Sequence, residues 1–137
     1  MTPADPAKRK SRVLVVEDEA IIACDLQRQL GELGYEPVGP AMRGEEAIDL
    51  AGSLRPDLVL MDIRLAGAMN GMDAAADIRA QWGLPIVLLT ALPPGPPATP
   101  TEPAGHMLIK PFTKEGLRTV LELALVKPPA LMPKEPK

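Results

Sequence analysis

Uninterrupted runs of apolar residues recur along the chain, separated by segments in which apolar residues follow a helical spacing. An apolar run without alternation is typical of a strand buried on both faces, as in a parallel sheet. The runs lie at 13–16, 58–61, 85–89 and 107–109, and a weaker strand is predicted at 35–38.

The segments between these strands carry the spacing of amphipathic helices. In the first of them, apolar residues recur at Ile22, Leu26, Leu30 and Leu33, and Gly34 ends the pattern. Further helices are predicted at 43–54, at about 72–82 and from the N-cap Thr113 to about Val126. Strands that alternate with helices predict a doubly wound α/β fold around a mostly parallel sheet.

The 17 prolines of the 137-residue chain are concentrated outside this pattern, with two in residues 1–11, six in 93–103 and four in 127–137. About a hundred ordered residues sustain one hydrophobic core. We therefore predict a disordered arm over 1–11, one domain over 12–126 and a disordered tail over 127–137. A Pro-rich loop at 93–105 interrupts the domain.

Charge and composition exclude several functions. Both predicted ends are basic, so that residues 12–126 carry a net charge of −7 against −3 for the whole chain. An acidic domain with three aromatic residues is poorly suited to a nucleic-acid partner. The single cysteine, Cys24, excludes an internal disulfide and is expected to be a small buried residue. Without a signal peptide or a membrane-spanning run, the chain is predicted to be soluble and cytoplasmic.

Polar residues with complementary chemistry stand where the predicted strands end. They are Glu17, Asp18, Asp62, Thr90 and Lys110. In a doubly wound sheet the carboxyl ends of the strands share one edge, where ligands bind. Taken singly, each residue is more simply a helix cap or a solvated loop residue. Together they combine Mg²⁺ ligands, a carboxylate nucleophile and two groups that hold phosphoryl oxygens.

The segments VLVVEDE, LVLMDIRLAGAMNG, IVLLTA and LIKPF resemble the receiver domain of two-component response regulators. The resemblance covers roughly residues 12–126. It implies a flavodoxin-like fold with a five-stranded parallel sheet. It also implies phosphoryl transfer from a sensor histidine kinase, or from a phosphotransfer protein of a phosphorelay, to an aspartate after the third strand.

Carried over by position, the resemblance makes Asp62 the phosphoacceptor. Mg²⁺ would be held by Glu17, Asp18, Asp62 and the backbone carbonyl of Arg64. Thr90 would be the switch hydroxyl, and Lys110 would pair with the phosphoryl oxygens. Pro111 would follow a cis peptide bond.

Several functional expectations follow from the resemblance. Slow hydrolysis would reset the protein, which is then an enzyme only in a limited sense. Because the chain ends after the last predicted helix, we expect a stand-alone receiver that acts through contact with a downstream protein.

Two departures from the family pattern matter. Where the family places its fourth helix, this chain has LPPGPPATPTEPAGH. Each interior proline costs a helix about 3 kcal/mol, so no helix is predicted there. A polyproline II segment and a disordered loop remain alternatives, and we hypothesise that phosphorylation or a partner orders the segment. Met107 stands where the family usually has an aromatic ring, which removes a ring-flip switch.

Other functions are compatible with the same fold. One is an adaptor that works without phosphorylation. Another is an aspartate-nucleophile phosphatase, which is disfavoured because Arg64 stands where such enzymes carry a second aspartate. The last helix also carries a wide apolar stripe, so a homodimer is an alternative for this surface. The stripe consists of Leu117, Val120, Leu121, Leu123, Ala124 and Leu125.

Overall fold

The computed structural model describes residues 10–65, 69–91 and 106–126, which form a parallel five-stranded sheet covered on both faces. The strands are β1 (Arg12–Val16), β2 (Glu36–Ala41), β3 (Leu58–Asp62), β4 (Ile86–Ala91) and β5 (His106–Lys110). The helices are α1 (Ala20–Glu32), α2 (Gly44–Leu54), α3 (Gly71–Trp82) and α4 (Lys114–Val126). The strand order is β2-β1-β3-β4-β5, and all neighbouring strands are parallel. The predicted α/β fold is confirmed.

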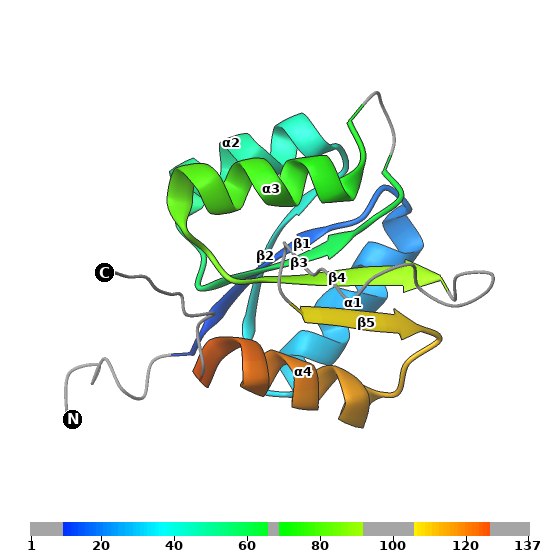
Figure 1. Ribbon diagram of the computed structural model, residues 1–137. Helices are drawn as coiled ribbons and strands as arrows, with labels where there is room; N and C mark the ends of the chain where they lie inside the picture. The colour runs from blue at the N-terminus through cyan, green and yellow to red at the C-terminus, as the bar shows by residue number, and fades with distance from the viewer. Residues whose placement is uncertain (1–9, 66–68, 92–105, 127–137) are drawn as a thin grey trace, which may run out of the picture.

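The central strands are buried because alternate residues enter two separate cores. Val13 and Val15 pack with Leu60 in a core that faces α1 and α4. Leu14 and Val16 pack in the other core, which faces α2 and α3. Figure 1 shows these two helix pairs on opposite faces of the sheet. Since every strand position finds an apolar partner, an uninterrupted apolar run is the favoured sequence.

Local sequence sets the ends of the helices. Gly34 follows α1 with a φ of 97°, a left-handed conformation that glycine adopts at little cost. At the start of α4, the Thr113 hydroxyl accepts a hydrogen bond from the Gly116 backbone N–H at 2.9 Å. The predicted N-cap of this helix is thus confirmed.

The prediction for β2 was too short, since the strand runs over Glu36–Ala41. Its sequence contains two prolines and Gly39, which has a φ of 95°. Prolines are tolerated here because β2 is an edge strand, paired with β1 alone among the described strands. The Glu17 backbone N–H donates to the Ala41 carbonyl at 2.8 Å, which extends this pairing to the end of the strand.

Two side-chain expectations are corrected or refined. Cys24 is exposed, not buried, because α1 turns Ala23 and Leu26 toward the core and leaves Cys24 on the solvent side. On α4 most of the apolar stripe is buried, but Leu123 is 54% exposed.

The remaining sequence predictions fall largely outside the described residues. The terminal segments 1–9 and 127–137 are not among them, nor is the Pro-rich loop predicted at 93–105 in place of a fourth helix. Within the described part of the chain, none of the helices has the length and apolar character needed to cross a membrane.

The connection between β3 and α3 is closed tightly by Gly71. Its backbone N–H donates to the Ile63 carbonyl at 2.7 Å. A Cβ atom at Gly71 would overlap the Asp62 carbonyl oxygen and stand 2.7 Å from the Ile63 Cα. Because both neighbours are backbone atoms, neither can turn away as a side chain would. The absence of a side chain at Gly71 therefore keeps Asp62 at the end of β3.

We expect Gly71→Ala to lower the free energy of unfolding by about 3 kcal/mol, because the added methyl group forces the backbone of β3 to move. Urea denaturation measures the change. Gly31→Ala is the matched control: it lies on α1 with nothing within 4 Å of an added Cβ, and we expect its stability to be unchanged or slightly higher. Equal stability of the two variants would contradict this role of Gly71.

Candidate functional site

Asp62 is the last residue of β3, and its side chain is held at both carboxylate oxygens. It is only 6% exposed. Its Oδ1 accepts from the backbone N–H of Arg64 at 2.9 Å, and its Oδ2 accepts from Lys110 Nζ at 2.8 Å. Lys110 ends β5, two strands away in the sheet, so the parallel topology brings together residues that are 48 positions apart.

Glu17 follows β1 directly and supplies a second buried carboxylate. It is 1% exposed, and its Oε2 accepts from the Glu19 backbone N–H at 3.2 Å. Its Oε1 is buried and accepts no hydrogen bond within the described part of the chain. Lys110 Nζ lies 3.9 Å from this atom. One ammonium group is therefore shared between two carboxylates.

Burial, followed by the neighbouring Asp62 carboxyl, raises the pKa of Glu17 to about 8. The Glu19 N–H and the Lys110 ammonium lower the pKa, but they do not offset the burial. Two carboxylates this close favour a proton or a cation between them. The Glu17 and Asp62 carboxyl groups together therefore favour more positive charge than the Lys110 ammonium alone supplies.

Asp18, Thr90 and Pro111 lie at the same edge of the sheet, whereas Met107 stands near the start of β5 and pairs with Leu88. Asp18 is half-buried beside Glu17, and Thr90 pairs with Ile109 in the ladder between β4 and β5. The Lys110–Pro111 peptide bond is cis. Met107 lies on β5 with its side chain 48% exposed.

The carboxylates form a pair, whereas the sequence suggested a cluster of three. No three or more His, Cys, Asp or Glu side chains among the described residues are grouped so that they could hold a metal ion. Even so, a buried carboxylate pair in which one oxygen accepts no hydrogen bond from the described residues fits a hard divalent cation such as Mg²⁺.

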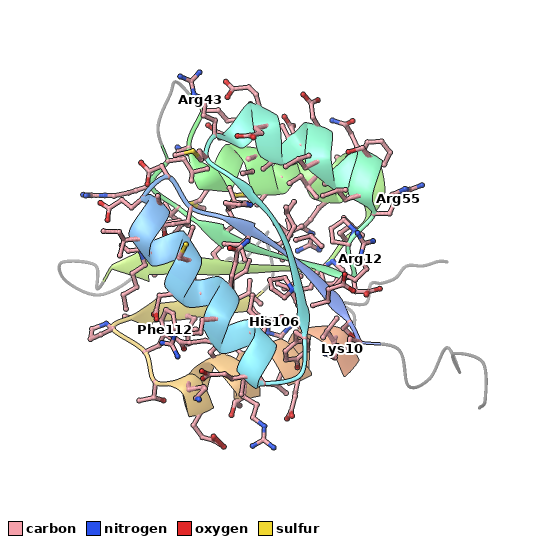
Figure 2. The ribbon with its side chains drawn as sticks, turned by 180° about the vertical axis from the view of Figure 1, so that it is seen from behind. Lys10, Arg12, Arg43, Arg55, His106 and Phe112 are labelled. Carbon is pink, nitrogen blue, oxygen red and sulfur yellow. The ribbon has the colours of Figure 1, made fainter. Side chains whose placement is uncertain are left out.

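A groove of about 520 Å³ opens beside Lys110, between α1 and the connection from β5 to α4. The wall from α1 consists of Ile22, Asp25 and Gln29. The opposite wall consists of Lys110, Pro111 and Phe112. Figure 2 shows Phe112 at the carboxyl edge of the sheet, away from Arg12 and Arg55 at the amino edge. The sequence did not predict this groove. The signal that could have indicated it is Phe112, one of three aromatic residues in the chain, which directly follows Lys110-Pro111.

The arrangement agrees with comparisons to known proteins. Residues 13–122 match the family described as the response regulator receiver domain. The chain belongs to this family. The receiver is 44% identical to the transcriptional regulatory protein PdtaR of Mycobacterium tuberculosis over 126 residues, which cover 90% of this chain and 60% of the relative.

Further relatives and solved structures are also receivers or contain one. The phyllosphere-induced regulator PhyR of Methylorubrum extorquens is 32% identical, over 87% of this chain and 45% of that protein. The receiver domain of PhyR from Erythrobacter litoralis superposes with a TM-score of 0.79 at 30% identity, covering 93% of this chain and 99% of that one. This receiver spans 60% or less of the lengths of PdtaR and PhyR.

The raised pKa of Glu17 predicts that the metal-free receiver loses stability as the pH rises. Between its unfolded value of 4.5 and its folded value of about 8, the folded state binds the extra proton. The free energy of unfolding therefore falls with increasing pH over this range, by about 1.4 kcal/mol per pH unit at most. Denaturation in the presence of a chelator measures the slope.

Glu17→Gln should remove this slope and make the receiver more stable than the wild type at pH 8. Glu19→Gln is the matched control, since Glu19 is exposed and contacts Glu17 through its backbone N–H. An equal slope in the wild type and in Glu17→Gln would show that Glu17 does not carry the proton.

Proposed function

We propose that this receiver accepts a phosphoryl group on Asp62 from a phosphohistidine donor. The observation that supports this best is the held Asp62 carboxylate, with the Arg64 N–H on one oxygen and Lys110 Nζ at 2.8 Å on the other. The donor would be a sensor histidine kinase or a phosphotransfer protein. The proposal extends the general role of the family to a residue of this chain.

The transfer needs a nucleophile and a way to spread negative charge. One Asp62 carboxylate oxygen attacks the phosphorus atom, and the bond between phosphorus and the donor's imidazole nitrogen breaks. The imidazole keeps the electron pair of that bond. The Arg64 N–H fixes the orientation of the carboxylate, and Lys110 neutralises charge on the phosphoryl oxygens. Thr90, the second-last residue of the neighbouring strand β4, would bind the phosphoryl group as the switch hydroxyl.

The reaction also needs charge compensation for the carboxylate pair. Glu17 and Asp62 would hold Mg²⁺, with Asp18 and the Arg64 backbone carbonyl as further oxygen ligands. When bound, the ion would lower the repulsion between the carboxylates and the incoming phosphoryl group. Glu17 would then be ionised and present its Oε1, which accepts no hydrogen bond from the described residues. Lys110 would remain free to turn from the carboxylate to the phosphoryl oxygens.

The output of the receiver would be contact with a downstream protein. The bound phosphoryl group biases the loops at this edge between two states, and hydrolysis of the acyl phosphate by water resets them. A PhyR of Bartonella quintana that resembles this chain is described as an anti-anti-sigma factor, and PdtaR as a transcriptional regulatory protein. We place the receiver in the cytoplasm, where a kinase's phosphohistidine would meet it.

A small phosphodonor tests the proposal directly. With acetyl phosphate and Mg²⁺, the wild type should gain the mass of one phosphoryl group, and the gain should disappear in Asp62→Asn because an amide is a poor nucleophile. Intact-protein mass spectrometry measures both. Asp49→Asn, which removes an exposed carboxylate on α2, should gain the mass as the wild type does.

Two results would contradict the proposal. A wild type that gains no mass would favour an adaptor that works without phosphorylation. A gain that persists in Asp62→Asn would place the phosphoryl group on another residue.

A further inference from the structure

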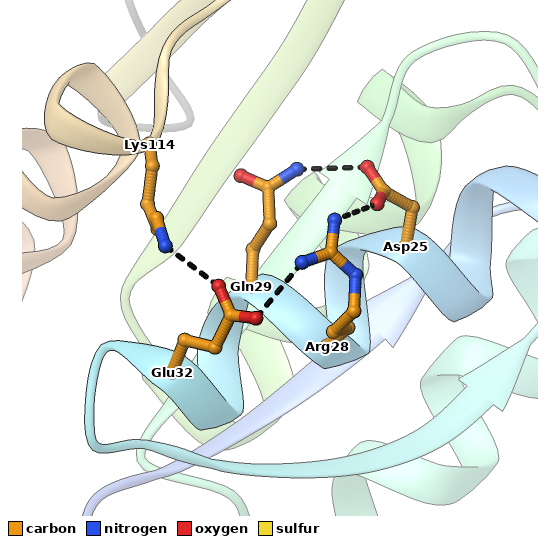
Figure 3. A network of polar contacts seen from close by, with 5 residues as sticks. All are labelled: Asp25, Arg28, Gln29, Glu32 and Lys114. Carbon is orange, nitrogen blue, oxygen red and sulfur yellow. Dashed lines mark hydrogen bonds and ion pairs between the residues drawn. The ribbon is translucent and has the colours of Figure 1, made fainter.

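A network of charged side chains joins α1 to the start of α4. Arg28 donates to Asp25 and, at 2.9 Å, to Glu32. Gln29 donates to the second Asp25 oxygen at 2.8 Å. Lys114, the first residue of α4, donates to the second Glu32 oxygen at 2.6 Å. Figure 3 shows Lys114 reaching across to α1, where the other four side chains lie.

The network uses all four carboxylate oxygens of its two acidic residues. The hydrogen bond from Lys114 lowers the pKa of Glu32, and the one from Arg28 lowers that of Asp25, so both stay ionised at neutral pH. All the charged members are about half exposed. A single exposed ion pair contributes little to stability, whereas several connected charges contribute more. In this network the Glu32–Lys114 pair joins α1 to α4, and the other contacts hold the α1 side chains in one arrangement.

The position of the network links it to Asp62. Asp25 and Gln29 belong to the α1 wall of the groove, and Lys110 belongs to the opposite wall. Lys110 and Lys114 are the two ends of a five-residue segment. One end pairs with Asp62 and the other with Glu32.

The segment between the two lysines is short and stiff. Its three inner residues span at most about 10 Å. The ring of Pro111 fixes φ, Phe112 packs against the core beneath α1 and α4, and Thr113 caps α4. A displacement of the Lys110 backbone is therefore passed to Lys114 with little loss along the segment.

We infer that this network is a brace that transmits the phosphorylation state of Asp62 to the α1 wall of the groove. When Lys110 turns from the Asp62 carboxylate to a phosphoryl group, the segment carries the movement to Lys114. Glu32 and Arg28 then pass it to Asp25 and Gln29. The inference rests on the proposed phosphorylation of Asp62 and adds a second surface that reports it.

Amide NMR spectra of the receiver before and after acetyl phosphate and Mg²⁺ test the brace. Phosphorylation should shift the amide signals of Asp25, Arg28 and Gln29 in the wild type. In Lys114→Gln and Glu32→Gln these shifts should shrink strongly, while the signals of Ile63 and Thr90 still move. Arg118→Gln is the matched control, because its ion pairs with Glu115 and Glu122 stay within α4. It should behave as the wild type does.

Coupling between two sites is reciprocal. Removing the brace should therefore also change the lifetime of the phosphoryl group, by about two- to fivefold for a pair of this exposure. High salt should make the wild type resemble Lys114→Gln, because exposed pairs are screened.

The possible outcomes separate the two proposals. If intact mass shows phosphorylation but the α1 signals stay fixed, or move equally in Lys114→Gln, the brace is overturned and the phosphoacceptor stands. If the wild type gains no mass, both proposals fail. The brace is supported if the α1 signals shift in the wild type and in Arg118→Gln, which keep the Glu32–Lys114 pair, and not in Lys114→Gln or Glu32→Gln.

Discussion

The pairing of two buried carboxylates with a single ammonium group is the interaction on which the receiver's site depends. Asp62 and Glu17 are 6% and 1% exposed, and Lys110 lies 2.8 Å from the first and 3.9 Å from the second. Two negative charges and one positive charge leave the site short of positive charge in surroundings that screen poorly. Because burial raises the pKa of Glu17, this residue holds a proton that offsets part of the missing positive charge. A divalent cation would offset the same missing charge, and its competition with the proton would link metal binding, pH and stability at this site.

The sheet creates this pairing because its strands are parallel and buried on both faces. Each strand ends at the same edge, and the two cores hold β1 and β3 so firmly that their last side chains have little freedom. Gly71 adds a local constraint, since its backbone lies directly against the Asp62 carbonyl and leaves no room for a side chain. The packing of the two cores therefore keeps the Glu17 and Asp62 carboxyl groups close together. A weaker core would allow them to move apart.

The sequence predicts the features of this receiver that depend on local patterns, and it does not predict those that depend on contacts between distant segments. The strands 13–16 and 58–61 were predictable because burial on both faces leaves an uninterrupted apolar run. The polar residue after each run then indicated the edge of the sheet. β2 was misjudged beyond Val38 because its pairing with β1 overrides the local preferences of Gly39 and Pro40. Three features depend on how helices and loops pack in three dimensions, which local sequence does not encode. They are the exposure of Cys24, the Glu17 oxygen that accepts no hydrogen bond from the described residues, and the groove.

Asp62 is buried, so a change at this residue must be carried outward before a partner can detect it. Met107 stands on β5 where the family usually has an aromatic, and a methionine side chain bends at three bonds and transmits little force. The segment from Lys110 to Lys114 is better suited, because a proline, a packed aromatic and a helix cap restrict it and an ion pair holds each end. Movement along it ends at Asp25 and Gln29, on the wall of a groove that already contains Lys110. The same lysine therefore lies at the proposed phosphoacceptor and on the surface that a partner would reach.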